Sequence, residues 1–273
     1  MPPPAFPVPE VLGPSEGALN LVVWQGYAED GSEKSGADWV HGFEDTSGCQ
    51  VNAKVDGTSD ETVAMMVSGQ YDAVSASGDA TVRLIAAGDI APINTALINT
   101  ALLPSFADIC PTLKNQPWNS VGGVAHGVPH GRGANVLMYD TAKVATPPTG
   151  NDVFDPASRP DDHPGQRRHR LVRHLDDLLQ RRSPQLRPQV AEPHHLPRIN
   201  AQVAEYHGVA PANSKACAHT VDPDSRTRRH ADDESYWKDI YYWSTPIVDC
   251  HDSRGSVRSD FATWVKAWAG ITG

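Results

Sequence analysis

The order of apolar and polar segments predicts an α/β protein built on a parallel sheet. Residues 19–24 form an apolar run of strand length before a turn at Gly26, and residues 50–55 alternate polar and apolar side chains as a second strand would. A helical stretch around residues 39–43 lies between them. A strand, a helix and a strand in this order favour parallel pairing, because the helix returns the chain to the end of the sheet where it began.

A capping box marks the start of the next helix. Thr58 is placed to accept a hydrogen bond from the amide three residues later, and the Glu61 side chain is placed to reach back, so we expect a helix over residues 62–68. Gly69 ends this helix, since glycine readily adopts the left-handed conformation that follows a helix.

Two polar residues follow a third predicted strand. Residues 71–75 have the composition of a strand, and residues 80–87 predict another helix. Ser77 and Asp79 lie between the two, at the carboxyl end of the strand. Open α/β sheets bind their ligands at this edge, so both residues are candidates for a binding site.

The second half of the chain is less regular. Residues 121–128 and 134–139 predict two strands around a turn at residues 129–133, and residues 200–206 predict a helix that Gly208 ends. The tail over residues 232–268 is rich in Trp and Tyr and must pack on something. One face of its predicted helix carries Phe261, Trp264, Val265 and Trp268.

Residues 159–198 have a composition unlike their surroundings. They contain nine Arg, five His and six Pro, but no Lys, Phe, Trp or Tyr. Apart from a short helix over residues 171–179, no regular period survives the prolines, so we expect this block to be disordered. We hypothesise that it is a coding region read out of frame. Five acidic residues offset its Arg and no aromatics are interleaved, which disfavours a nucleic-acid tract.

Charge and cysteine content exclude several classes of protein. With 33 Asp and Glu against 23 Lys and Arg, the chain is acidic, which argues against a nucleic-acid surface. No apolar run is long enough to span a membrane. The cysteines have no zinc-binding spacing, so they are packing residues or remnants of disulfides: Cys49, Cys110, Cys217 and Cys250.

Several segments, taken in order along the chain, resemble the substrate-binding proteins of spermidine/putrescine ABC importers, which are periplasmic-type solute-binding proteins. The similarity extends over residues 18–158 and from residue 199 to the end. The segments that carry it are residues 21–27, 57–61, 69–79, 116–119, 127–134 and 201–206 with 211–213.

This resemblance implies a two-lobed α/β clamp that closes on its ligand. Residues 18–145 would form a largely intact first lobe, and residues 201–273 a C-terminal helical part that completes the lobes. Residues 146–200 would be a truncated or disrupted part of the second lobe. Residues 1–17 are a Pro-rich leader that we expect to be disordered and that carries no export signal.

The resemblance also implies a polyamine site. Trp24 and Tyr27 would be the aromatic walls for the methylene chain, and Ser77 and Asp79 would meet one ammonium group. The implied partners are the polyamine and the permease subunits of the transporter, with the protein acting as a monomer in the periplasm or attached to the outside of the membrane. We expect no catalytic residue, no cofactor, no metal and no nucleic acid.

Other interpretations of these residues stay open. Trp24 ends a buried strand, where an aromatic residue is more often a core residue than a ligand, although the family resemblance favours the binding role. Asp79 is equally explained as a carboxylate that stabilises a helix N-terminus. A hydrolase is disfavoured because no Gly-x-Ser-x-Gly elbow follows a strand. The resemblance further implies cysteine partners for Cys217 and Cys250 at Arg226 and Arg258.

The alternative function is a non-binding remnant of such a protein. The unusual block, the missing export signal and the immediate repeat of residues 93–97 as residues 98–102 all favour it. If the chain binds, the loss of second-lobe carboxylates predicts weak, salt-sensitive binding, and the residues that separate spermidine from putrescine are not identifiable.

Overall fold

The computed structural model describes residues 16–33, 36–94, 104–134, 140, 142, 178–181, 196–238, 240, 242 and 261–272. The chain divides into two compact units, one formed by Met1–Gly133 with His174–Gly273 and the other by Ala134–Arg173. Only residues 134, 140 and 142 of the second unit are described, so the expected disruption of a second lobe falls largely outside the described residues.

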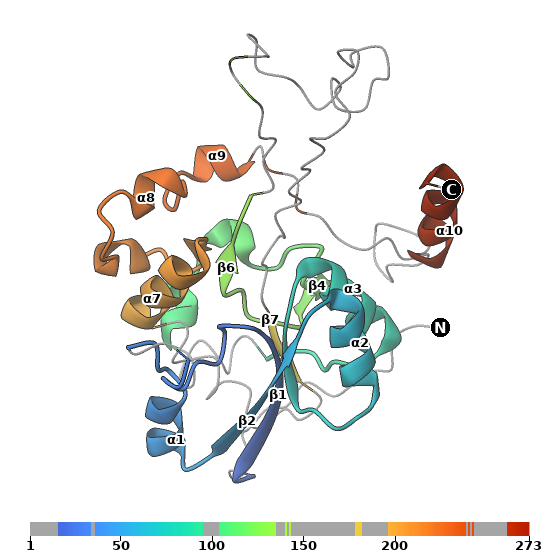
Figure 1. Ribbon diagram of the computed structural model, residues 1–273, viewed down its shortest axis with the longest axis horizontal. Coiled ribbons are helices and arrows are strands. Elements are labelled where there is room, and N and C mark those ends of the chain that lie inside the picture. Colours follow the sequence, from blue (N-terminus) through green and yellow to red (C-terminus); the bar gives the residue numbers. More distant parts are fainter. Residues whose placement is uncertain are drawn as a thin grey trace. The chain divides into compact units, whose positions relative to one another are not determined.

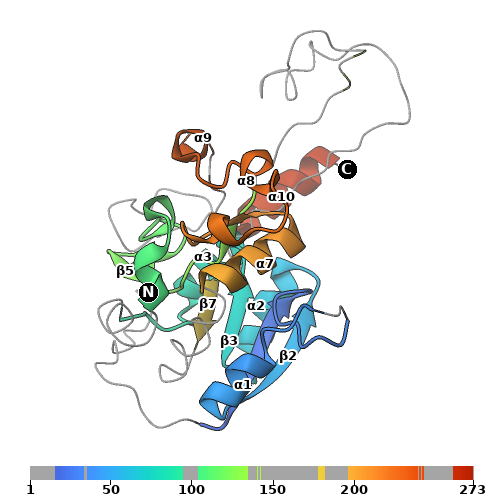
Figure 2. The ribbon, with the colours of Figure 1, turned by 90° about the vertical axis from the view of Figure 1, so that its left-hand side faces the viewer.

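The centre of the first unit is a four-stranded sheet with the strand order β2-β1-β3-β7. Strands β1, β2 and β3 run parallel and lie side by side in Figure 2, whereas β7 is antiparallel to β3. This confirms the predicted α/β class with a parallel sheet. The strands are β1 (Ala18–Trp24), β2 (Gln50–Asp56), β3 (Ala73–Ala76) and β7 (Leu178–Arg181).

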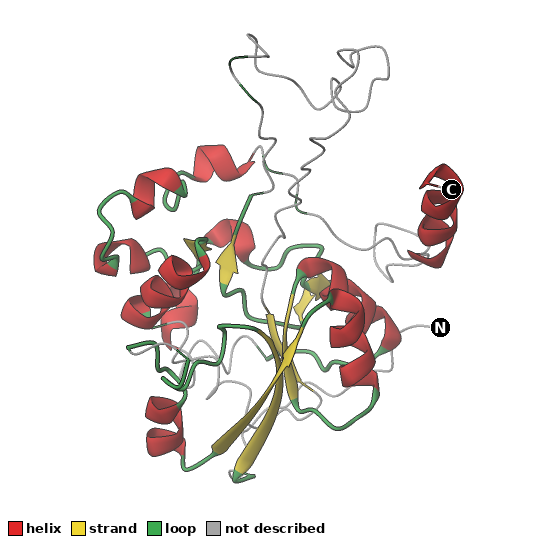
Figure 3. Ribbon diagram, in the orientation of Figure 1, coloured by secondary structure: helices red, strands yellow, loops and turns green. Residues whose placement is uncertain are grey.

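Helices α2 (Ser59–Val67) and α3 (Gly78–Ala87) cover one face of the sheet (Figure 3). Val22 of β1 and Val74 of β3 point to this face and pack against Met66 and Leu84 of the helices; none of the four is exposed to solvent. Since side chains alternate between the two faces of a strand, the neighbours of Val22 point to the other face.

The opposite face carries the larger core. Leu21 and Val23 of β1 pack there with Phe43 of α1 (His41–Ser47) and with Leu113 and Val203 from later parts of the chain. The sheet is therefore covered on both faces, as parallel sheets require.

The predicted capping box is confirmed, with one difference. Thr58 is the N-cap of α2, and its hydroxyl accepts a hydrogen bond from the amide of Glu61 at 3.2 Å. The Glu61 carboxylate reaches back one residue further than a standard capping box and accepts from the amide of Gly57 at 2.8 Å. Both bonds satisfy amides that a helix start leaves without partners.

The predicted strand over residues 121–128 is a tight hairpin instead. Strands β4 (Ser120–Val121) and β5 (Val124–Ala125) pair antiparallel, and the turn places Gly122 and Gly123 at φ 58° and 81°. Two successive glycines permit this turn because they adopt positive φ without steric cost.

The predicted turn over residues 129–133 contains a strand. β6 (Gly131–Arg132) pairs antiparallel with β8 (Ala210–Pro211), a partner from the far end of the chain that no local pattern indicates (Figure 1). Of the strand predicted over residues 134–139, all but Ala134 lies outside the described residues.

Strand β7 lies inside the Arg- and Pro-rich block. Its four residues, Leu178–Arg181, include no proline, so their amides are free to pair with β3. The helix predicted over residues 171–179 overlaps this strand, and its last two residues are extended rather than helical.

The C-terminal part is helical. The helix predicted over residues 200–206 is confirmed and begins three residues earlier, with Gly208 as its left-handed C-cap. No described helix is long and apolar enough to cross a bilayer. Val265 is 50% exposed, and the side chains of the other three apolar residues predicted on its helix face are not among those described. The helices are α7 (Pro197–His207), α8 (Ser225–Arg228), α9 (Glu234–Lys238) and α10 (Phe261–Thr272).

Candidate functional site

The carboxyl ends of the three parallel strands bring the predicted site residues to one edge of the sheet. Trp24, the last residue of β1, is in register with Asp56, the last residue of β2. Val22 of β1 is in register with Val74 of β3, so Trp24 lies level with the end of β3, immediately before Ser77. Trp24, Ser77 and Asp79 therefore belong to the same edge, as the sequence predicts.

Ser77 and Asp79 are in direct contact. Ser77 is the N-cap residue of α3, and its hydroxyl donates a hydrogen bond to the Asp79 carboxylate. The Ser77 hydroxyl also lies 3.2 Å from the hydroxyl of Ser59, in the first turn of α2. Asp79 is in the first turn of α3, where the helix dipole stabilises a negative charge. The starts of two helices thus converge on one polar group of side chains.

Trp24 and Tyr27 are both buried, at 6% and 3% exposure, and belong to the larger core. The backbone carbonyl of Tyr27 accepts a hydrogen bond of 3.0 Å from the indole Nε1 of Trp39. This hydrogen bond anchors the turn after β1, and both predicted aromatic residues pack in the core.

The Tyr27 ring is enclosed by two histidines that come from distant parts of the chain. His207, the last residue of α7, stacks on it with ring centroids 3.9 Å apart and an interplanar angle of 13°. His130 meets the ring edge to face at 5.4 Å and 70°. Neither histidine is among the residues predicted for this site, because no local pattern indicates which distant residues meet the Tyr27 ring.

Gly26 is the local signal that indicates this close packing. Its φ of +90° favours glycine, and a Cβ atom there would lie 2.6 Å from Tyr206 and 2.7 Å from His207. Any residue other than glycine at position 26 would place its Cβ atom too close to these two side chains.

Burial shifts the protonation of groups around this turn. Burial lowers the pKa of His207, against a smaller opposing effect of the Gly26 backbone, so its ring is neutral at pH 7. Burial raises the pKa of Glu29, and the charges of Glu33 and Asp30 raise it further. The surroundings of Tyr27 thus contain a neutral imidazole and a carboxyl group whose pKa is raised.

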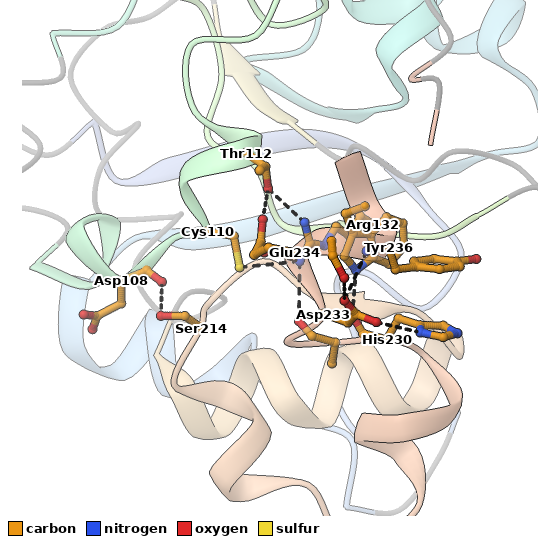
Figure 4. A network of polar contacts seen from close by, with 12 residues as sticks. Asp108, Cys110, Thr112, Arg132, Ser214, His230, Asp233, Glu234 and Tyr236 are labelled. Atoms are coloured by element: carbon orange, nitrogen blue, oxygen red, sulfur yellow. Dashed lines mark hydrogen bonds and ion pairs between the residues drawn. The ribbon is translucent and has the colours of Figure 1, made fainter. Parts of the chain in front are cut away.

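A second polar group centres on Arg132 of β6, which has no exposed surface (Figure 4). Its Nη2 donates to Glu234 Oε1 at 2.6 Å and its Nη1 to the Thr112 hydroxyl at 2.9 Å, while Thr112 donates to Glu234 Oε2 at 2.7 Å. The guanidinium also lies 4.4 Å from the ring centroid of Trp237. These contacts join β6 to α9 through a closed ring of hydrogen bonds.

Cys217 lies near the position at which the resemblance implies its cysteine partner. Burial raises the pKa of Cys217, the charge of Asp232 adds to this shift, and the charge of Arg226 opposes it. Arg226 itself forms an ion pair with Asp232. In the described part of the chain, Cys110 and Cys217 are free thiols.

No family model matches the chain, but solved structures share its fold. A protein from Listeria monocytogenes assigned to a spermidine/putrescine ABC transporter is similar with a TM-score of 0.60 and 11% identity, over 84% of this chain and 93% of that chain. The spermidine/putrescine ABC transporter substrate-binding protein PotD from Streptococcus pneumoniae has a TM-score of 0.60 and 12% identity, over 94% and 97%. An ABC transporter protein from Rhodopseudomonas palustris has a TM-score of 0.56 and 13% identity, over 95% and 100%.

These similarities confirm the expected resemblance at the level of the fold. Each match extends over nearly the whole of the solved chain, which does not favour the interpretation as a remnant. The chain therefore has the fold of the substrate-binding proteins of spermidine/putrescine ABC transporters.

Proposed function

We propose that this chain is the substrate-binding component of an ABC importer and that its ligand is a polyamine, spermidine or putrescine. The observation that carries the proposal is the edge of the sheet at which Trp24, Ser77 and Asp79 meet, in a fold that solved polyamine-transporter proteins share. Open α/β sheets bind ligands at this edge.

The chemistry of these residues suits an ammonium group. The Asp79 carboxylate, held by Ser77, accepts charge-assisted hydrogen bonds from the ligand. The rings of Trp24 and Tyr27 attract a cation and pack against methylene groups. This role differs from catalysis, because the ligand is held and released unchanged.

In this proposal, residues 18–145 supply the first lobe and residues 201–273 complete the lobes, while residues 146–200 belong to a disrupted second lobe. The protein acts as a monomer on the outer side of the membrane and presents its ligand to the permease. We expect binding to be weak and sensitive to salt, because in this proposal the disrupted second lobe supplies no carboxylates and exposed charges are screened. Resequencing the coding region for residues 157–200 tests the hypothesis of a shifted reading frame.

The direct test is a titration of the purified protein with spermidine and with putrescine, followed by tryptophan fluorescence and by isothermal titration calorimetry. We expect saturable binding that weakens as salt is raised from 50 to about 500 mM. Absence of heat and of fluorescence change with both ligands would refute the proposal. Tight binding that does not change with salt concentration would refute a site formed by the first lobe alone.

The role of Asp79 is tested by Asp79→Asn, with Asp45→Asn as the matched control. Asp45 is exposed on α1, so its substitution removes the same charge away from the sheet edge. We expect Asp79→Asn to weaken putrescine binding by about 10- to 100-fold, the value of a charged hydrogen bond, and Asp45→Asn to change it less than about twofold. Equal effects of the two variants would show that only net charge matters.

A further inference from the structure

One flat face of the Tyr27 ring is already covered in this structure. The imidazole of His207 stacks on it almost in parallel, with a centroid distance of 3.9 Å and an interplanar angle of 13°. His130 meets the ring at 70°, which is an edge contact. His207 therefore takes the position above the Tyr27 ring that a stacked ligand would need.

The imidazole and a polyamine compete for the same surface. A cation is attracted to the face of an aromatic ring rather than to its edge, and a methylene chain gains most contact by lying flat on it. His207 is neutral because burial lowers its pKa, so it gains stacking energy but none of the cation–π attraction that an ammonium ion gains. An incoming ammonium ion thus has an advantage over the ring that it must displace.

Besides the stack, the imidazole packs closely on Gly26 and interacts with its backbone. Its Nε2 atom is buried and makes no hydrogen bond within the described part of the chain. Tyr206 touches the imidazole only edge to face, at 5.2 Å and 75°. His207 is also the last residue of α7, directly before the left-handed Gly208. Movement of this side chain breaks its contact with the Gly26 backbone but no hydrogen bond of Nε2.

We propose that His207 occupies the ligand-binding face of Tyr27 in the unliganded protein and leaves it when a polyamine binds. The inference rests on the proposed polyamine-binding role of Tyr27. His207 is then a determinant of affinity, because a ligand that binds to the Tyr27 face must first break the stack between Tyr27 and His207.

The test is a calorimetric titration with putrescine of the wild type and of two variants. His207→Ala frees the Tyr27 face and should bind putrescine about two- to tenfold more tightly, the range that an aromatic pair contributes. His207→Phe keeps a ring on Tyr27 and should bind more weakly than the wild type. His219→Ala, which alters an exposed histidine of the 3₁₀ turn Ala216–His219, is the matched control and should bind as the wild type does.

A purely structural role of His207 gives the opposite order of affinities. His207→Ala would then loosen the site and bind more weakly, and His207→Phe would bind about as well as the wild type. Either that order, or equal affinity of wild type and His207→Ala, overturns the inference. The polyamine function survives both results, because the wild type still binds.

A failure of the proposed function looks different. If neither the wild type nor His207→Ala binds putrescine, the polyamine function is refuted and the inference with it. If His207→Ala binds putrescine and the wild type does not, both the polyamine function and the inference about His207 are supported. If His207→Ala does not fold, the ring protons of His207 in the wild type provide the measurement by NMR. They should be shifted upfield by the Tyr27 ring and move downfield at saturating putrescine, and an unchanged shift contradicts displacement.

Discussion

Two regions of the molecule are held together in different ways. One is the sheet region over residues 18–88, and the other is the layer around Arg132, formed by Thr112, Arg132, Glu234 and Trp237. In the sheet region local signals mark helix ends, such as the Thr58 cap of α2 or the left-handed Gly88 after α3. In the layer around Arg132 the contacts join distant segments, since Arg132 bonds to Glu234 and Thr112 also bonds to Glu234.

The two regions also bury polar groups differently. Around Arg132 a guanidinium with no exposure pairs with one carboxylate among the described residues, and the side chain of that carboxylate, Glu234, is 37% exposed. In the sheet region the capping bonds of Thr58 and Glu61 lie at the exposed start of a helix. Loss of a capping bond leaves an amide that water reaches, whereas loss of Glu234 leaves a buried charge without its counter-ion. We therefore expect the distant contacts to have the larger effect on stability.

The largest effect is expected for Glu234→Ala. This substitution leaves the buried Arg132 without a counter-ion and should reduce the free energy of unfolding by about 3–5 kcal/mol in urea denaturation. Glu234→Gln is the matched control, because its amide oxygen keeps an acceptor for Arg132 although its NH2 group replaces the oxygen that accepts from Thr112, and it should cost less. Equal losses for Ala and Gln would show that the charge alone matters, and a loss below about 1 kcal/mol for Ala would contradict a stabilising ion pair.

A somewhat smaller effect is expected for Gly26→Ala, where the sheet region contacts α7. The new Cβ would collide with Tyr206 and His207 and would also be strained at φ +90°, so we expect a loss of about 2–4 kcal/mol in thermal or urea denaturation. Gly36→Ala separates the two causes, since Gly36 has φ +88° but no neighbour within 4 Å. It should lose only the strain, about 1–2 kcal/mol. Similar losses at both positions would mean that the packing on Gly26 is loose.

Thr58→Ala tests the local signal of the sheet region. It removes the hydroxyl that accepts from the amide of Glu61 and should reduce the free energy of unfolding by about 1 kcal/mol. Thr58→Ser retains the hydroxyl and should stay close to the wild type in the same denaturation experiment. A loss as large as that of Glu234→Ala would contradict the contrast between the two regions.

The smallest effect on the free energy of unfolding is expected when the pH is lowered. Burial alone would raise the pKa of Glu234, but the hydrogen bonds from Arg132 and Thr112, with the charge of Arg132, outweigh it and lower the pKa below the ordinary 4.5. A lowered pKa in the folded state means that this contribution to stability is complete above pH 4.5 and is lost as the pH falls through the lowered value. Urea denaturation between pH 6 and 3 should therefore show a shallower pH dependence for Glu234→Gln than for the wild type.

Much of the sheet region can be predicted from the residues alone. Capping residues, glycines after helices and alternating apolar residues act within a few positions of each other, so the strands β1 and β2 and the helices α2 and α3 follow from short stretches. The hairpin of β4 and β5 was the exception, since its two glycines lie inside what reads as one strand. Strand β7 was not predicted either, because backbone pairing with β3 needs no particular side chain and so leaves no pattern in the sequence.

The candidate site could be predicted only in part. Ser77 and Asp79 follow from their position after a strand, and the structure brings them into contact. Tyr27 follows from the family resemblance, but its stack with His207 does not, because that contact depends on where α7 packs. No local pattern indicates that Arg132 is buried against α9 either.

The residues of this chain are sufficient to specify its α/β class, its parallel strands and the edge at which Trp24, Ser77 and Asp79 gather, because those features arise from signals a few positions apart. The partners of Tyr27 and Arg132 depend on the packing of segments that are distant in the sequence. Such contacts arise from the burial of apolar surface, which is not directional, so the particular side chains that meet are determined by the shape of the whole core.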